Sequence, residues 1–260
     1  MCGGVSRDLD ADLRFAHQLA DAADAVTLGR FRALDLQVET KPDLTPVSEA
    51  DRAAEETVRK LVRDSGRLEG VLGEEFDDVA GDVRWIVDPI DGTKSYVRGV
   101  PVWATLLALE VEGSIDVAVV SAPALERRWW ATRGGGAFGA SAFGDGMRLA
   151  VSRIATLENA TVSCTSARSL PVGWTELARR AWAARGWADF WQHSLVAEGA
   201  IELAVENGLK IWDYSAISLV VEEAGGRMST FDGEPLRPDG TVLASNGLLH
   251  AEAMALLSGR

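Results

Sequence analysis

From Arg84 to Lys94 the chain reads Arg-Trp-Ile-Val-Asp-Pro-Ile-Asp-Gly-Thr-Lys. The apolar run at its start is typical of a short buried strand. Two carboxylates, Asp88 and Asp91, leave the end of that strand together, and Gly92-Thr93 follows where a helix can begin. Hard divalent cations bind oxygen ligands, and phosphate binds the N–H groups at a helix start. The stretch therefore predicts metal-assisted chemistry on a phosphate group.

Size and charge narrow the class of protein. The chain has 260 residues, 47% of them hydrophobic and 25% charged, which is enough for a sizeable core in one domain or two fused halves. A net charge of −13 argues against a nucleic-acid partner or an anionic membrane surface. The longest apolar run, residues 100–109, is too short to span a membrane. With two cysteines and no pattern of a secretion signal, we expect a cytoplasmic protein.

Apolar spacing and turn residues predict a mixed α/β chain whose first half is mainly antiparallel. Helices are expected over residues 9–32, 176–184, 195–200, 215–224 and 248–257. A further helix is expected to follow the polar bend at residues 41–51 and to run to about residue 62. Strands are expected over residues 71–72, 84–87, 102–111, 115–121, 128–132, 160–164, 202–205, 227–229 and 242–244. A boundary near residues 140–150 would separate an N-terminal half, 1–145, which carries most candidate metal ligands, from a C-terminal half, 146–260, which carries Asp213 and the candidate specificity residues.

Acidic residues stand at four places where one element passes to the next. These are Asp51, Glu74, the pair Asp88 and Asp91, and Asp213. Taken singly, each has an ordinary explanation, because Asp caps helices and Asp-Gly forms turns. Together they suit metal-assisted phosphoryl transfer, in which two cations about 3.5–4 Å apart need several carboxylates to offset their charge.

The same segments resemble the inositol monophosphatase family, the lithium-sensitive, magnesium-dependent phosphatases. The resemblance is carried by residues 85–96, 212–216 with 223–226, 73–75 and 41–51, which occur in the family's order and cover essentially the whole chain. It implies an α/β (α+β) fold, a five-layer αβαβα sandwich, and a homodimer.

The resemblance also implies a set of site residues. Two or three Mg²⁺ ions per site would be held by Glu74, Asp88, the backbone carbonyl of Ile90, Asp91 and Asp213. The N–H groups of Gly92 and Thr93 would hold the phosphate. The catalytic residues would be Glu74, Thr93 and Asp51: Glu74 and the Thr93 hydroxyl orient a metal-bound water for in-line attack, and Asp51 supports Thr93. A second Mg²⁺ would stabilise the leaving alkoxide, without a covalent enzyme intermediate.

The identity of the phosphate ester depends on residues outside the metal site. Residues 41–47, 99–104, 121–130 and 244–250 look like the actinobacterial histidinol-phosphatase branch, which hydrolyses L-histidinol phosphate to L-histidinol and phosphate in histidine biosynthesis. Asp189 lies between aromatic residues, where inositol phosphatases carry small polar residues. A polyol offers no positive charge to this carboxylate, whereas an ammonium group does. Glu206 matches the family position that binds substrate hydroxyls or amine. Arg98 stands where many relatives carry histidine and is a third candidate for binding the substrate, with a place on the cavity rim as its alternative.

Other interpretations remain open. Trp187 and the run Trp191-Gln192-His193 depart from the smaller or tyrosine-type residues expected in that branch, so a phosphatase for inositol-1-phosphate or another small sugar phosphate, including one in secondary metabolism, is the alternative. The ordinary explanations are a helix or core pair for the tryptophans, a cap for Asp189, an edge-strand acid for Glu206 and a packed His193. A silent regulatory protein or a simple cation binder is disfavoured, because every expected carboxylate is present and mere binding needs neither Thr93 nor Glu74.

Overall fold

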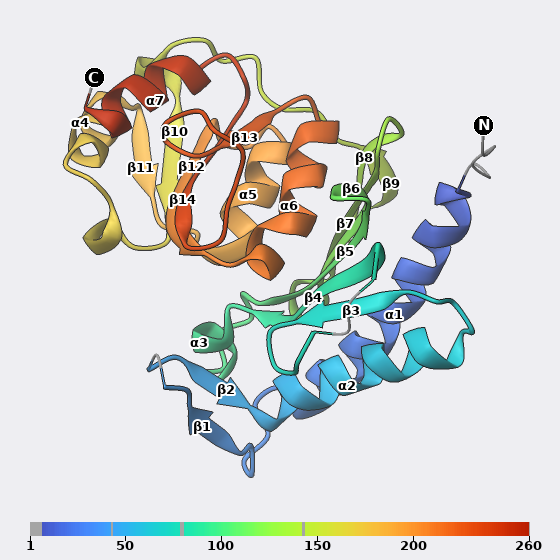
Figure 1. Ribbon diagram of the computed structural model, residues 1–260. Helices are drawn as coiled ribbons and strands as arrows, with labels where there is room; N and C mark the ends of the chain where they lie inside the picture. The colour runs from blue at the N-terminus through green and yellow to red at the C-terminus, as the bar shows by residue number, and fades with distance from the viewer. Residues whose placement is uncertain (1–6, 43, 79–80, 142–143, 260) are drawn as a thin grey trace.

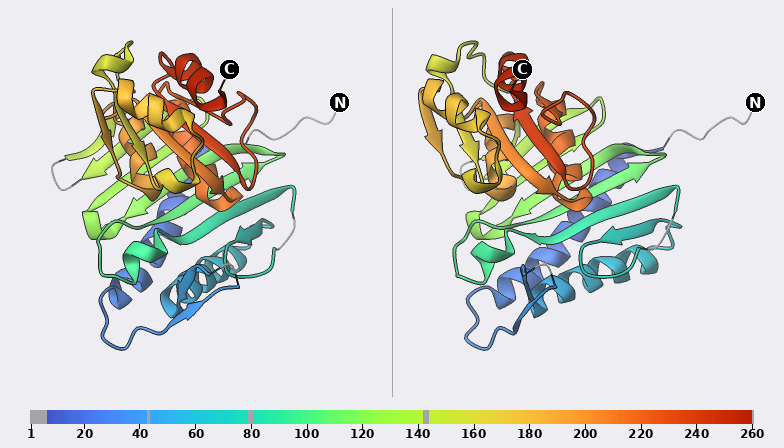
Figure 2. Two further views of the ribbon diagram at one scale, coloured as in Figure 1. Left: turned by 90° about the vertical axis from the view of Figure 1, so that its left-hand side faces the viewer. Right: turned by 60° about the vertical axis from the view of Figure 1, so that its left-hand side comes forward.

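The computed structural model describes residues 7–42, 44–78, 81–141 and 144–259. Within these residues, helices and sheets alternate in five layers (Figure 1; two further views in Figure 2). This arrangement confirms the αβαβα sandwich that the resemblance implied.

Helices α1 (Leu9–Arg30) and α2 (Glu49–Asp64) form the first outer layer. Asp8 caps α1 through the Ala11 N–H, and α2 begins with a capping box made by Ser48 and Asp51. Small and apolar residues at helical spacing, such as Ala16 and Leu19 of α1, pack against the first sheet and stabilise this layer.

The second layer is a seven-stranded sheet in the order β3-β4-β5-β6-β7-β8-β9. Strands β3 and β4 are parallel, and the other neighbours are antiparallel. Alternate residues of β4 face opposite cores, because Trp85 and Val87 pack against α1 and α2 while Ile86 faces the inner helices. The strands are β3 (Gly70–Gly73), β4 (Val83–Asp91), β5 (Ala104–Val111), β6 (Ser114–Ala122), β7 (Arg127–Thr132), β8 (Gly136–Ser141) and β9 (Gly144–Arg148).

The remaining three layers come from the second half of the chain. Helices α5 (Asp189–Ala197) and α6 (Ile211–Glu223) lie between the two sheets, and α4 (Gly173–Arg180) and α7 (His250–Ser258) cover the outer face of the second sheet (Figure 1). That sheet has the order β11-β10-β12-β14-β13. Its strands are β10 (Thr161–Cys164), β11 (Ala183–Arg185), β12 (Leu203–Leu209), β13 (Arg227–Ser229) and β14 (Gly240–Ser245).

Several short elements were not predicted. They are strands β8, β9 and β11, the hairpin of β1 (Val38–Thr40) and β2 (Pro46–Ser48), and the 3₁₀ turns η1 (Pro123–Leu125), η2 (Leu157–Asn159) and η3 (Ala167–Ser169). The helix start expected at Gly92-Thr93 is confirmed as α3 (Thr93–Tyr96), with Gly92 at its N-cap. The helix expected over 176–184 ends at Arg180, because Ala181 is already extended and β11 follows. The helix expected over 195–200 is α5, which begins at Asp189 and ends at Ala197. No side-chain cap marks this start.

The two halves of the chain share one core. Residues of α5 and α6 pack with residues of β5, β6 and β7 in a single buried cluster. Strand β9 extends to Arg148, so the division at residue 145 stays a prediction. Among the described residues, no helix is both long and apolar enough to cross a membrane.

Candidate active site

A break in the register of β4 creates the centre of the site. Asp88 pairs with Leu106 of β5, and Asp91 pairs with Ala104, so that the two residues between them, Pro89 and Ile90, oppose one residue of β5. In a regular strand, residues three apart point to opposite faces of the sheet. The bulge adds one residue and brings both carboxylates to the same side.

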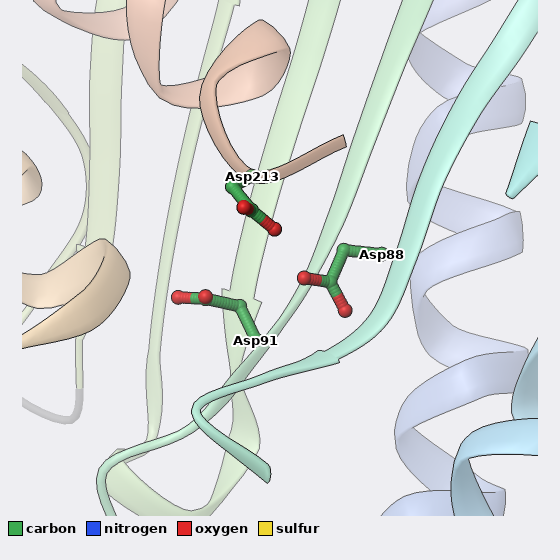
Figure 3. Close-up of side chains that lie close together, drawn as sticks. All are labelled: Asp88, Asp91 and Asp213. Carbon is green, nitrogen blue, oxygen red and sulfur yellow. The ribbon is translucent and has the colours of Figure 1, made fainter. Parts of the chain in front are cut away.

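Asp213, at the start of α6, completes this cluster. One carboxylate oxygen from each of Asp88, Asp91 and Asp213 lies within 4.8 Å of the other two (Figure 3). Backbone N–H groups hold all three in place: Ile90 donates to Asp88 (3.0 Å), Phe190 donates to Asp91 (2.6 Å) and Lys210 donates to Asp213 (2.6 Å).

Burial and mutual repulsion raise the pKa of all three carboxyl groups. The pKa values of Asp88 and Asp91 lie well above the ordinary range, first because both are buried and then because their acidic neighbours repel a second charge. For Asp213 the same causes raise the pKa to about 7. Convergent carboxylate oxygens that resist ionisation without a counter-charge suit a hard divalent cation, so the residues present fit the divalent metal that the resemblance implied.

The three aspartates lie on the wall of a cavity of about 550 Å³. The cavity is formed where β4, α3, α5, β12 and the start of α6 meet. Its lining includes Lys41, Thr45, Glu74, Ile90, Gly92, Thr93, Lys94, Thr165, Asp189, Phe190, His193, Glu206, Lys210 and Trp212 in addition to the three aspartates.

Thr93 and Asp51 form a connected pair beside the aspartates. The Thr93 hydroxyl lies 3.0 Å from the Ile90 carbonyl oxygen and 3.2 Å from Asp51 Oδ1. The other Asp51 oxygen accepts hydrogen bonds from the backbone N–H and the hydroxyl of Ser48. Burial raises the pKa of Asp51, against the opposing effect of Ser48. These bonds fix the orientation of the Thr93 hydroxyl at the cavity wall.

Glu74 also reaches the cavity, but it is paired with a cation of the chain itself. Lys41 Nζ lies 2.7 Å from Glu74 Oε1 and 2.6 Å from Glu75 Oε1. Burial is the main cause that raises the pKa of Glu75 to about 7. Lys41 belongs to the segment between β1 and β2, so this ion pair attaches that hairpin to the active site. The sequence offered no signal for the pairing.

The start of α5 is a strained turn that places Asp189. Ala188 has φ 59° and ψ 157°, and Asp189 has φ 50°, conformations that residues other than glycine rarely adopt. Gly92 approaches this turn closely, since a Cβ there would lie 3.2 Å from Asp189 Oδ2 and 2.9 Å from the Val102 carbonyl oxygen. The Asp189 N–H donates to Thr165 Oγ1 (3.0 Å). Burial, with a contribution from Glu206, raises the pKa of Asp189 to about 6.

The structure separates the other candidate substrate residues. Glu206 and His193 line the cavity, whereas Arg98 is exposed and lies outside its lining. Trp187 and Trp191 pack against the central core, as the ordinary explanation held. They are not an i,i+4 helix pair, because α5 begins after Trp187.

Comparisons with known proteins agree with this fold and with the family resemblance. The profile of the Inositol monophosphatase family matches residues 8–259. A protein named histidinol-phosphatase from Streptomyces coelicolor is 49% identical, with 96% of this chain and 97% of that protein covered. The histidinol-phosphatase of Mycobacterium tuberculosis is 47% identical, with 95% and 98% covered. The solved structure of a Thermotoga maritima IMPase superposes with a TM-score of 0.86 at 29% identity, covering 96% of this chain and 97% of that one.

Proposed function

The chain belongs to the inositol monophosphatase family, and on that basis we propose that it is a Mg²⁺-dependent phosphomonoesterase that hydrolyses L-histidinol phosphate to L-histidinol and phosphate. The family is metal-dependent, and the aspartate cluster supports a metal site here. Two relatives at 47–49% identity carry the name histidinol-phosphatase. The observation that carries the choice of substrate is Asp189, a carboxylate on the cavity wall that an ammonium group would neutralise.

Asp88, Asp91 and Asp213 would hold Mg²⁺ with the Ile90 carbonyl oxygen, and Glu74 would join them once Lys41 releases it. Two or three bound cations would neutralise the phosphate oxygens, lower the pKa of a bound water and stabilise the leaving oxygen.

The protein's own contribution is to orient water and phosphate. The Thr93 hydroxyl can donate its proton to Asp51 or to the Ile90 carbonyl, so its lone pairs are left to accept a hydrogen from water. Glu74 supplies a second acceptor for that water on the same wall. The water is thereby turned with its oxygen toward phosphorus.

Gly92 and Thr93 would bind the phosphate from the start of α3. The first N–H groups of a helix have no partner within the helix. Gly92, in the left-handed conformation at φ 86°, lets the backbone turn tightly beneath the cavity, where a side chain would collide with Val102 and Asp189.

The test is a phosphate-release assay with purified protein, with Mg²⁺ and with EDTA. L-Histidinol phosphate is compared with inositol-1-phosphate, fructose-1,6-bisphosphate and larger sugar phosphates. We expect kcat/KM for L-histidinol phosphate to exceed the others by at least tenfold, about 1.4 kcal/mol of selectivity. A higher value for inositol-1-phosphate or a sugar phosphate would establish the alternative activity.

Two further proposals rest on the family resemblance and composition. We expect a homodimer, which light scattering of the eluted protein can test, and a cytoplasmic location, which fractionation of the producing cells can test.

A further inference from the structure

His193 is a buried histidine on the wall of the active-site cavity. It is 1% exposed, yet it belongs to the lining of the cavity. Neither ring nitrogen has a hydrogen-bond partner among the described residues. A buried polar group without a hydrogen-bond partner destabilises a fold. An unpaired nitrogen on a cavity wall is therefore available to form a hydrogen bond with a bound ligand.

The helix brings this imidazole to the same cavity as Asp189. The two residues are four apart on α5, and such residues lie on the same face of a helix. Both reach the same cavity. Glu206 approaches from β12, with its Oε2 3.5 Å from His193 Nε2. Two carboxylates and one imidazole nitrogen therefore converge from two elements.

The buried side chain of Gln192 holds Glu206 in this position. The side-chain amide of Gln192 donates to Glu206 and to Thr165, and Thr165 in turn accepts the Asp189 N–H. Gln192 is fully buried and does not line the cavity. This chain of contacts fixes the spacing of Asp189 and Glu206, so the acceptors are preorganised for a ligand.

We propose that His193 determines specificity for amines, as the third hydrogen-bond acceptor for a primary ammonium group that Asp189 and Glu206 also bind. This inference rests on the proposed function, because it assigns a residue to the amine of that substrate. A primary ammonium has three N–H donors and no acceptor, and a neutral imidazole has one bare nitrogen. Two carboxylates with one imidazole nitrogen satisfy all three donors, whereas a deaminated ester has only C–H groups at that position and offers no donor.

The test compares phosphate esters with and without an amine. One pair is L-histidinol phosphate and 3-(imidazol-4-yl)propyl phosphate; a second, which lacks the imidazole, is 2-aminobutyl phosphate and butyl phosphate. The variant His193→Phe keeps a ring of similar size without an acceptor, and His193→Gln restores an acceptor. His193→Met, which also lacks nitrogen, replaces His193→Phe if that variant does not fold. For each enzyme, the ratio of kcat/KM for the amine to that for the deaminated ester is measured.

In the wild type we expect the amine to be preferred in both pairs. His193→Phe should lower that preference about 10- to 100-fold, the effect of losing a hydrogen bond to a charged group, mainly through KM. His193→Gln should recover most of the preference, and esters without an amine should change by less than about threefold. Binding of L-histidinol in EDTA, measured by calorimetry, should be tightest for the wild type, weaker for His193→Gln and weakest for His193→Phe.

The outcomes separate this inference from the proposed function. A wild type that prefers inositol-1-phosphate to L-histidinol phosphate contradicts the proposed function, while the aminobutyl pair still tests His193. An amine preference that is unchanged in His193→Phe overturns the assignment of His193 alone. An equal loss on amine and deaminated esters shows a merely structural role and overturns it too, as does a wild type without any amine preference.

Discussion

Replacing Asp213 by asparagine should make the metal-free protein more stable. The pKa of Asp213 is raised from 3.8 to about 7 by burial and by acidic neighbours. Asparagine is neutral, and its side-chain oxygen can still accept the Lys210 N–H at the start of α6. The substitution therefore removes the repulsion and keeps the contact that orders the helix.

The size and sign of the effect follow from proton linkage. The folded pKa is raised, so the unfolded chain ionises first, and the cost of folding grows as pH rises from about 4 to 7. The folded and unfolded pKa values differ by about 3, and each step of one corresponds to roughly 1.4 kcal/mol, so the cost to folding above pH 7 is at most about 4 kcal/mol. Allowing for partial solvent screening, we expect Asp213→Asn to gain about 2–4 kcal/mol at pH 8 and much less at pH 4.

The assay is urea unfolding followed by tryptophan fluorescence, in EDTA and in Mg²⁺. In EDTA at pH 8 the variant should have the higher midpoint. Mg²⁺ at 100 times its Kd should stabilise the wild type by about 2.7 kcal/mol and the variant by much less. The exposed Asp64→Asn, at the end of α2, serves as the control and should show no comparable gain. A variant that is less stable than the wild type in EDTA at pH 8, or a gain independent of pH, would refute this reasoning.

Three other substitutions test two features beside the site and one buried histidine outside it. Lys41→Met should bind Mg²⁺ about 3- to 10-fold more tightly by calorimetry, because Lys41 no longer competes for Glu74; weaker binding would contradict this competition. Ala188→Gly should raise stability by about 1 kcal/mol and Tm by about 2–4 °C, by relieving the strained turn, whereas Ala155→Gly should not; equal effects would argue against strain. His250→Gln should remove a pH dependence of stability. Burial lowers the pKa of His250 to about 4, so the wild type should lose up to about 3 kcal/mol as pH falls from 6.5 to 4, and an identical pH slope in the variant would disprove this role.

The acidic residues could be predicted because their signal is local. Asp51, Asp88, Asp91 and Asp213 each stand next to a recognisable strand end or helix start, and the structure brings all four to one region. Most helices and strands could also be predicted, because the spacing of apolar residues shows whether an element is covered on one face or on both.

The contacts made across the fold carried no such signal. Lys41 meets Glu74 across 33 positions of sequence, and its choice of partner depends on where the β1–β2 hairpin lies. The start of α5 was missed because Ala188 and Asp189 adopt backbone conformations that their residue types disfavour. For His193 the sequence favoured a packed role, because nothing next to it in the chain indicates the cavity that it lines.

The bulge at Pro89 and Ile90 brings Asp88 and Asp91 to the same side of the sheet. The sequence predicted that the two carboxylates act together, but it did not predict this bulge. A spacing of three along a regular strand would have sent Asp88 and Asp91 to opposite faces. Proline lacks the N–H that a sheet ladder needs, so it suits an interruption of the register. Ile90 is fully buried in a small cluster with Tyr96 and Trp103, and this packing anchors the bulge. The candidate metal site thus depends on the apolar packing of one of its own lining residues: Ile90 secures the backbone whose N–H binds Asp88 and whose carbonyl accepts from Thr93.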